Sequence, residues 1–151
     1  MENERRILWL LWAAMLACLG LYLAIPLLVP PRPEPWYDAQ TSVAQFVAAL
    51  LSMAAAVGSF SLRESLVLRE LRRGTLDPTS PIGFVIVRRA LVVLWALCEV
   101  IALLGLGVAL GSGRPPLAWL YTALAAVLLV IHAPRAWYFA RPVQGASGSA
   151  A

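Results

Sequence analysis

The amino-acid sequence predicts an all-α protein, an integral membrane four-helix bundle with both termini on the cytoplasmic side. Hydrophobic residues form 61% of its 151 residues and charged residues only 13%, whereas about a quarter of the residues in an ordinary soluble domain are charged. Four apolar runs approach the length of about 20 residues that a helix needs to cross a bilayer, and arginines flank them unequally. These observations predict one membrane domain over residues 1–144 and a disordered tail over residues 145–151.

The first span is expected over residues 7–29, directly after Arg5 and Arg6. Pro26 is expected to kink or end this helix, because proline lacks the amide donor. Four further prolines from Pro30 to Pro35 cannot continue a helix, and each restricts the residue before it. The sequence therefore predicts a stiff external connector after the first span.

The second span, expected over residues 41–62, carries a small residue at every fourth position. This spacing places Ala44, Ala48, Ser52 and Ala56 on one helix face, and such a stripe lets a neighbouring helix approach closely in lipid. We therefore expect these residues to be helix-packing positions.

Leucines and charged residues alternate after the second span, which predicts an amphipathic cytoplasmic extension over residues 63–73. Leu62, Leu66 and Leu71 are expected on its apolar side. Gly74 is the expected stop, because glycine readily adopts the left-handed conformation found at helix C-termini. A turn over residues 77–81 then leads into the third span.

The third and fourth spans are expected over residues 82–110 and 117–133, joined by a short loop rich in glycine and proline. Gly107 and Gly111 form a GxxxG pair, a frequent motif of close helix packing.

The end of the fourth span carries polar and aromatic residues. His132 is expected to be solvated at the membrane surface, and a proton-relay role is the less favoured alternative. Trp137, Tyr138 and Phe139 are expected to form an interfacial aromatic cluster.

All twelve basic residues are arginine, and their positions predict the orientation, because basic residues in short loops stay on the cytoplasmic side. Ten of them fall on one side of the expected bundle: Arg5, Arg6, Arg63, Arg69, Arg72, Arg73, Arg88, Arg89, Arg135 and Arg141. The other two are Arg32 and Arg114. We therefore expect a multi-pass protein of the inner (plasma) membrane. Each arginine near the cytoplasmic surface would attract anionic lipid by about 1 kcal/mol.

The sequence carries no motif of enzymatic or metal chemistry. The patterns G-x-x-x-x-G-K, GxSxG and HExxH are missing, as are paired catalytic carboxylates. Cys18 and Cys98 lie inside apolar runs, where a thiol is usually a small buried hydrophobe. We therefore expect no enzyme activity, no catalytic residue, no metal, no cofactor and no nucleic-acid partner.

Glu99 is the only acidic residue inside an expected span, and it lies near the middle of the third one. An ionised and unpaired carboxylate at that depth costs about 2.5 kcal/mol or more. Glu99 is therefore expected to be protonated unless a cation, an arginine or water reaches it. A buried acid of that kind can bind and release a proton, but no second ionisable group is expected beside it.

The stretch around Glu99 resembles a known family. Residues 96–110 read ALCEVIALLGLGVAL, which is similar to the carboxylate helix of the c subunits (proteolipids) of rotary ATP synthases. The resemblance extends to the second span, because c subunits pair a small-residue helix with the carboxylate helix through a cytoplasmic connection. It implies an ion-binding role for Glu99 and packing roles for Gly105 and Gly107.

Two functions remain open at this stage. The first is a proteolipid-like membrane subunit, expected to be homo-oligomeric, in which Glu99 exchanges a proton or small cation. The second is a non-transporting accessory or scaffold subunit of a larger membrane complex, in which the Glu99 carboxyl group is a helix-packing contact worth about 0.6 kcal/mol on average.

Overall fold

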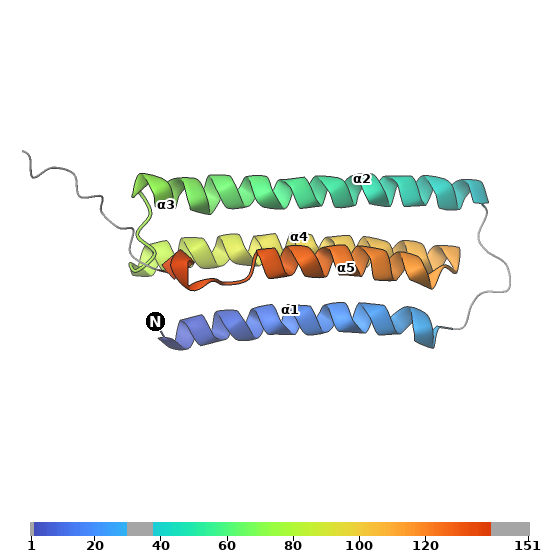
Figure 1. Cartoon of the computed structure of the whole chain (residues 1–151), viewed down its shortest axis with the longest axis horizontal. Coiled ribbons are helices and arrows are strands. Elements are labelled where there is room, and N and C mark those ends of the chain that lie inside the picture. The colour runs from blue at the N-terminus through green and yellow to red at the C-terminus, as the bar shows by residue number, and fades with distance from the viewer. Residues whose placement is uncertain (1, 30–37, 140–151) are drawn as a thin grey trace, which may run out of the picture.

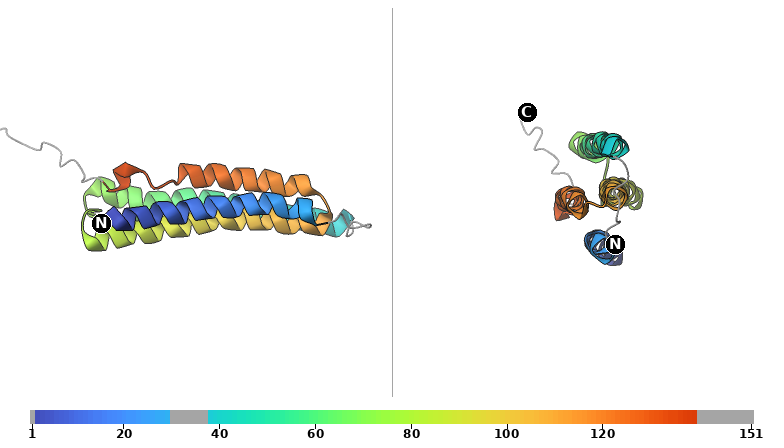
Figure 2. Two further views of the ribbon diagram at one scale, coloured as in Figure 1. Left: turned by 90° about the horizontal axis from the view of Figure 1, so that it is seen from below. Right: turned by 90° about the vertical axis from the view of Figure 1, so that its right-hand side faces the viewer.

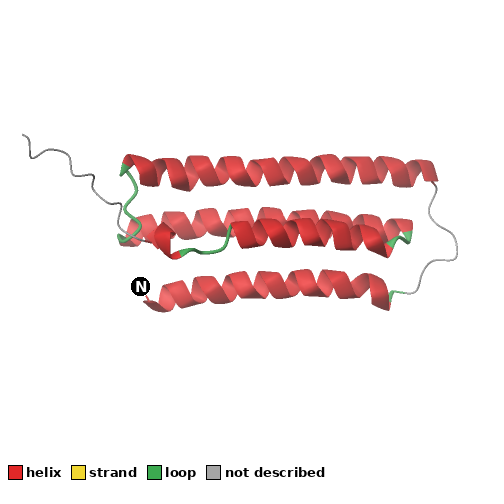
Figure 3. Cartoon of the chain, in the orientation of Figure 1, coloured by secondary structure: helices red, strands yellow, loops and turns green. Residues whose placement is uncertain are grey.

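The computed structural model describes residues 2–29 and 38–139, and this part of the chain is helical and has no strand (Figure 3). The long helices are α1 (Glu2–Leu28), α2 (Asp38–Arg63), α4 (Pro81–Ser112) and α5 (Pro115–Ile131). Three short elements are the π-helix η1 (Glu64–Leu68), α3 (Arg69–Arg73) and the 3-10 helix η2 (Ala136–Phe139). The predicted connector after the first span and the predicted tail lie outside the described residues.

Within the described residues, three helices are long and apolar enough to cross a membrane: α1, α2 with its extension, and α4. By this measure the chain is a membrane protein. The fourth helix, α5, is equally apolar but has only 17 residues, which corresponds to about 25 Å at 1.5 Å per residue. Helix α5 ends at Ile131, two residues before the end of the predicted span 117–133, because His132 leaves the helical conformation.

The four long helices form an elongated bundle in which α1 and α2 lie on opposite sides of the α4–α5 hairpin (Figures 1 and 2). Helix α1 packs on both α4 and α5, whereas α2 packs mainly on α4. The start of α1, the extension of α2, the start of α4 and η2 meet at one end of the bundle. We call this the arginine-rich end, and the α4–α5 turn marks the opposite end.

Helix α4 is the central element, and its bounds follow from local signals. The Ser80 side chain accepts a hydrogen bond from the Gly83 amide at 3.0 Å, and Pro81 occupies the first helical position, which suits proline. A Cβ added to Gly83 would lie 1.9 Å from the Asp77 carbonyl oxygen, so the preceding turn requires glycine there. Gly113 ends α4 in the left-handed conformation, with φ 66°.

The extension of α2 reaches Arg73 and stops at Gly74, which has φ 69°, as the sequence predicts. Its apolar side differs from the prediction: Val67 is fully buried, whereas Leu66 is 44% exposed. The cause is the π-helix η1, which takes more residues per turn than an α-helix. The inward stripe therefore runs from Leu62 to Val67 and then to Leu71, with spacings of five and four residues.

Candidate functional site

Glu99 lies on the side of α4 that faces α1. Both of its carboxyl oxygens are buried, and neither makes a hydrogen bond of ordinary geometry within the described residues. The polar group that faces the carboxyl is the Tyr22 hydroxyl from α1. A buried polar atom without a partner costs free energy. Among the described residues, hydroxyl oxygens of Ser52, Ser112 and Thr122 and the His132 Nδ1 share this situation, but Glu99 is the carboxyl group among them.

Tyr22 is a site residue that the sequence interpretation missed, because no second polar group was expected near Glu99. The signal was available in the chain. Tyr22 lies 20 residues after the start of α1, and Glu99 lies 18 residues after the start of α4. Both helices begin at the arginine-rich end (Figure 1), so the two residues lie at about the same depth. A tyrosine inside an apolar helix, six residues before the helix ends at Leu28, was the available clue.

Two thiols complete the surroundings of this pair. Cys18 lies one turn before Tyr22 on α1, and Cys98 is the fully buried chain neighbour of Glu99. No group of three or more possible metal ligands occurs among the described residues. One carboxyl and one hydroxyl supply too few oxygen ligands for a hard cation such as Mg²⁺ or Ca²⁺. The arrangement can nevertheless hold a proton on the carboxyl group.

The predicted small-residue stripe of α2 divides into a buried and an exposed part. Ala48 and Ser52 are 4% and 3% exposed, and their helix packs on α4. Ala56 is half-buried and Ala44 is exposed. The stripe continues to Ser59, which is 1% exposed. Small side chains therefore line the side of α2 that lies against the bundle.

The predicted packing glycines of α4 also differ in how closely a neighbouring helix approaches them. A Cβ added to Gly105 would lie 2.2 Å from the Tyr121 Cβ of α5, so only glycine allows this approach of the two helices. A Cβ added to Gly107 or Gly111 would meet nothing within 4 Å. Any packing role of these two glycines stays a prediction that concerns contacts outside the chain.

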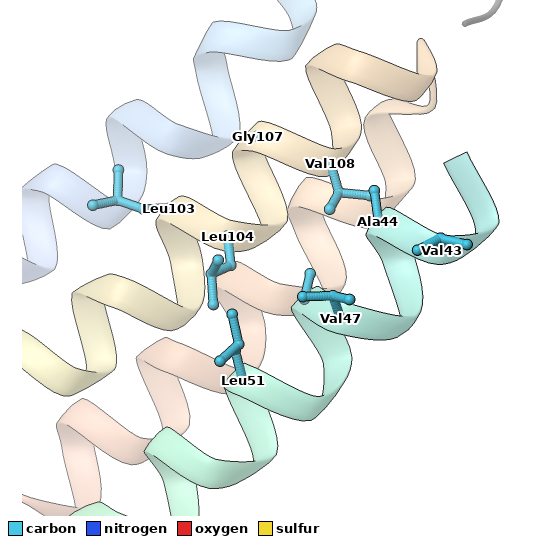
Figure 4. A pocket seen from close by; sticks show the side chains of 9 residues that line it. Val43, Ala44, Val47, Leu51, Leu103, Leu104, Gly107 and Val108 are labelled. Atoms are coloured by element: carbon cyan, nitrogen blue, oxygen red, sulfur yellow. The ribbon is translucent and has the colours of Figure 1, made fainter. Parts of the chain in front are cut away.

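Gly107 and Ala44 instead line an open groove between α2 and α4. We call it the α2–α4 groove; its volume is about 680 Å³, and its walls include Val47, Leu51 and Leu104. Figure 4 shows these aliphatic side chains along the two helices. The groove lies in the half of the bundle that is nearer the α4–α5 turn.

A second polar cluster lies at the end of α5, around His132. The expectation of a solvated histidine is wrong, because His132 is fully buried. Its Nε2 lies 3.1 Å from the Ser59 Oγ of α2, and its backbone oxygen accepts a hydrogen bond from the Trp95 Nε1 of α4 at 2.9 Å. The ring also stacks at a tilt on Phe60, with 5.3 Å between centroids. His132 thus joins three helices, because α5 ends inside the protein and not at its surface.

Tyr138 and Phe139 are also buried, which corrects the prediction of an interfacial aromatic cluster for these two residues. Tyr138 is fully buried and Phe139 is 5% exposed; the Trp137 side chain lies outside the described part of the chain. The Tyr138 hydroxyl accepts a hydrogen bond from the Arg63 Nε at 2.7 Å. Phe139 packs on Phe84, with 5.6 Å between ring centroids.

The first helix contacts the same C-terminal segment. Arg5 donates a hydrogen bond to the Phe139 backbone oxygen at 3.2 Å, and its guanidinium carbon lies 5.3 Å from the centre of the Phe139 ring. We call η2 together with Arg5 and Arg63 the terminal clasp. It ties α1 and α2, which lie on opposite sides of the hairpin, to one segment.

Electrostatics in the terminal clasp favour the neutral form of Tyr138. Burial raises the pKa of its hydroxyl above the ordinary value, although the positive charges of Arg63 and Arg135 act in the opposite direction. The hydroxyl therefore keeps its proton, and one of its lone pairs accepts the Arg63 hydrogen bond.

The described arginines gather at one end of the bundle. Those of α1, of the α2 extension and of the start of α4 lie at the arginine-rich end, whereas Arg114 lies at the α4–α5 turn. One of them, Arg72, forms an ion pair with Glu64. Arg32 and Arg141 lie outside the described residues.

Comparisons of the chain with protein-family models, with curated proteins and with solved structures find no match.

Proposed function

We propose that this chain is a proteolipid-like membrane subunit in which Glu99 binds and releases a proton. The observation that carries the proposal is the pair of buried, unpartnered carboxyl oxygens of Glu99 facing the Tyr22 hydroxyl. Ionisable groups inside membrane helices are costly, and they commonly mark proton or ion pathways. The resemblance of residues 96–110 to c subunits adds independent support.

A proton suits this site better than a metal cation. An unpaired carboxylate in the membrane costs about 2.5 kcal/mol or more, and a bound proton removes that charge without further ligands. Tyr22 can donate a hydrogen bond to the carboxyl group or accept one from it. The Tyr22 hydroxyl can therefore form a hydrogen bond with both the protonated and the ionised form of the Glu99 carboxyl group.

The proposed orientation places the arginine-rich end in the cytoplasm and both termini with it. All described arginines except Arg114 lie at or near that end, and arginines in short loops are retained on the cytoplasmic side. The four helices then cross the inner (plasma) membrane as four spans, with α5 as the shortest. The exposed arginines are the proposed contact for anionic lipid headgroups.

The proposed assembly is a homo-oligomer, because one Glu99 in an isolated bundle cannot form a continuous proton path. The accessory-subunit alternative is favoured by one observation: the α2–α4 groove is wide, apolar and open. Purification in mild detergent separates the two proposals. A uniform oligomer of this chain supports the first, and a complex with other membrane proteins supports the second.

The function is tested by replacing Glu99 in protein reconstituted into lipid vesicles. Glu99→Gln keeps the size and hydrogen-bonding capacity of the side chain but cannot titrate, so we expect an intact assembly and no proton flux. Glu99→Leu also removes the polar contact and should loosen the assembly modestly. Full flux with Glu99→Gln, in an assay that Glu99→Leu impairs, would show that the carboxyl group only supports packing.

A further inference from the structure

The α2–α4 groove is apolar along its whole length. Every residue that lines it is aliphatic or glycine, and none has a polar side chain. Ala48 forms its floor and is 4% exposed, whereas Val43, Leu51 and Leu103 at its walls are 63%, 51% and 48% exposed. Gly107 leaves the α4 side open, because an added Cβ would meet nothing within 4 Å. The groove therefore offers an occupant apolar contact and no side-chain hydrogen bond.

The depth of the groove matches one leaflet of a bilayer. Leu103 is its deepest lining residue on α4, and it lies about 14 Å from the end of that helix at Ser112, at 1.5 Å per residue. On α2 the lining residues from Val43 to Leu51 extend over about 12 Å. The hydrocarbon core of a bilayer is about 30 Å thick, so one leaflet contributes about 15 Å. The groove therefore spans the leaflet on the side of the α4–α5 turn.

The volume of the groove suits a single hydrocarbon chain better than a helix. A helix with its side chains is about 10 Å across, so a 12 Å length of it occupies about 900 Å³. The groove holds about 680 Å³, and side chains of both helices stand along it (Figure 4). An extended acyl chain is much thinner than a helix and can lie between these side chains. Space left empty there would forfeit dispersion contacts on both walls.

A positive charge lies at the end of the bundle where the groove begins. Arg114 is exposed at the α4–α5 turn. A guanidinium forms paired hydrogen bonds with phosphate oxygens, and the phosphates of phospholipids lie at the edge of the hydrocarbon core, level with a polar turn between two spans. The groove and Arg114 therefore lie at the depths of the acyl chain and the phosphate of one lipid molecule.

We propose that the α2–α4 groove binds one acyl chain of an anionic phospholipid whose phosphate contacts Arg114. The lipid belongs to the leaflet on the side of the α4–α5 turn. It covers Gly107, for which the chain itself supplies no packing partner. Glu99 faces α1, whereas the groove faces α2, so the lipid site is separate from the proposed proton-binding site.

The proposal is tested by photo-cross-linking the whole chain in vesicles of phosphatidylcholine. A minor share of phosphatidylglycerol carries a photoactivatable group on its acyl chain, and mass spectrometry of the digested protein maps the modified residues. We expect modification to concentrate on residues 43–51 and 103–108. Leu120 and Leu124 of α5 are exposed at similar distances from the turn. They report contact with bulk lipid and should be modified less.

Four variants connect the modification to the groove and to the charge. Gly107→Leu fills the groove and should lower its modification several-fold. Gly111→Leu is the matched control, because an added Cβ again meets nothing but Gly111 does not line the groove. Ala44→Leu fills the groove from α2 and should act like Gly107→Leu. Arg114→Gln should lower modification by the phosphatidylglycerol probe about five-fold, because one charge near the headgroups is lost.

Two results would overturn the lipid site. Equal modification of the groove and of the α5 leucines, unchanged in every variant, would show that only bulk lipid touches the groove. Groove residues that stay unmodified while the α5 leucines react would show that another protein chain covers the groove. Either result would leave the proposed role of Glu99 untouched.

Discussion

Glu99 and Gly105 both lie on α4 but face different helices, and each has one tyrosine as its neighbour. Tyr22 of α1 faces the Glu99 carboxyl group, and Tyr121 of α5 fills the space that a side chain at position 105 would need. The sequence singled out Glu99 as an acid inside an apolar helix, and the resemblance to c subunits implied a packing role for Gly105. The sequence did not identify either tyrosine, because their roles depend on which helices become neighbours.

Replacement of Gly105 should show how closely α4 and α5 approach. Gly105→Ala places a Cβ 2.2 Å from the Tyr121 Cβ, and overpacking of this kind usually costs about 1–3 kcal/mol. Gly107→Ala is the matched control, because its Cβ would meet nothing within 4 Å. The midpoint of unfolding in a detergent titration should fall for Gly105→Ala alone. Equal midpoints for the two variants would contradict the close α4–α5 contact.

At the scale of elements, local signals account for the helix ends and tertiary contacts account for the differences from the prediction. Ser80 and Gly113 act within a few residues, so a sequence pattern can reveal the bounds of α4. The π-helix η1 moves the buried position of the extension from Leu66 to Val67. The spacing of apolar residues in the sequence does not indicate this shift. His132 and Tyr138 are buried because α2, α4 and α5 enclose them.

The terminal clasp should depend on the hydrogen bond between Arg63 and Tyr138. Tyr138→Phe keeps the packed ring but removes the acceptor, so hydrogen exchange of the amides from His132 to Phe139 should become faster. A typical hydrogen bond to a charged group contributes about 1.5–3 kcal/mol. Arg63→Met removes the same hydrogen bond and also the guanidinium that lies 5.8 Å from the centre of the Tyr138 ring, so its effect should be at least as large. The double variant should add little to Arg63→Met, because the hydrogen bond is already lost.

The same exchange measurement has a defined pH dependence. The pKa of Tyr138 is raised by burial, so the folded clasp favours the protonated hydroxyl. Its contribution to stability is complete below the ordinary tyrosine pKa of about 10, and it is lost as the pH rises through the higher folded value. Tyr138→Phe should not show this loss. A clasp that loosens at neutral pH in the unmodified protein would contradict the assignment.

For the whole molecule, hydropathy and arginine positions predicted a helical membrane protein, and three helices have the length and composition for it. These features depend on composition and chain order alone. The arrangement of α1 and α2 on opposite sides of the hairpin was not predictable, because apolar faces of similar composition do not specify neighbours in lipid. The Tyr22–Glu99 pair, the buried His132 and the terminal clasp all follow from that arrangement.

The proposed orientation predicts which positions a membrane-impermeant thiol reagent reaches in intact cells. A cysteine at Thr75 should be protected, and a cysteine at Arg114 should react, because these exposed positions lie at opposite ends of the bundle. Ser112 is a poorer reporter, since it is only 4% exposed. Cys18→Ala and Cys98→Ala remove background labelling. The reverse pattern would contradict the orientation and would leave the fold unaffected.

The central claim, that Glu99 carries an exchangeable proton inside the bundle, is tested most directly by infrared spectroscopy of the protein in lipid at neutral pH. We expect a carbonyl band of a protonated carboxylic acid that shifts in heavy water and is missing from Glu99→Gln, because an unpaired charge at this position is disfavoured. The shift should develop with time, since exchange requires access to the buried oxygens. A spectrum in which Glu99→Gln removes only carboxylate bands, and no protonated band, would contradict the account.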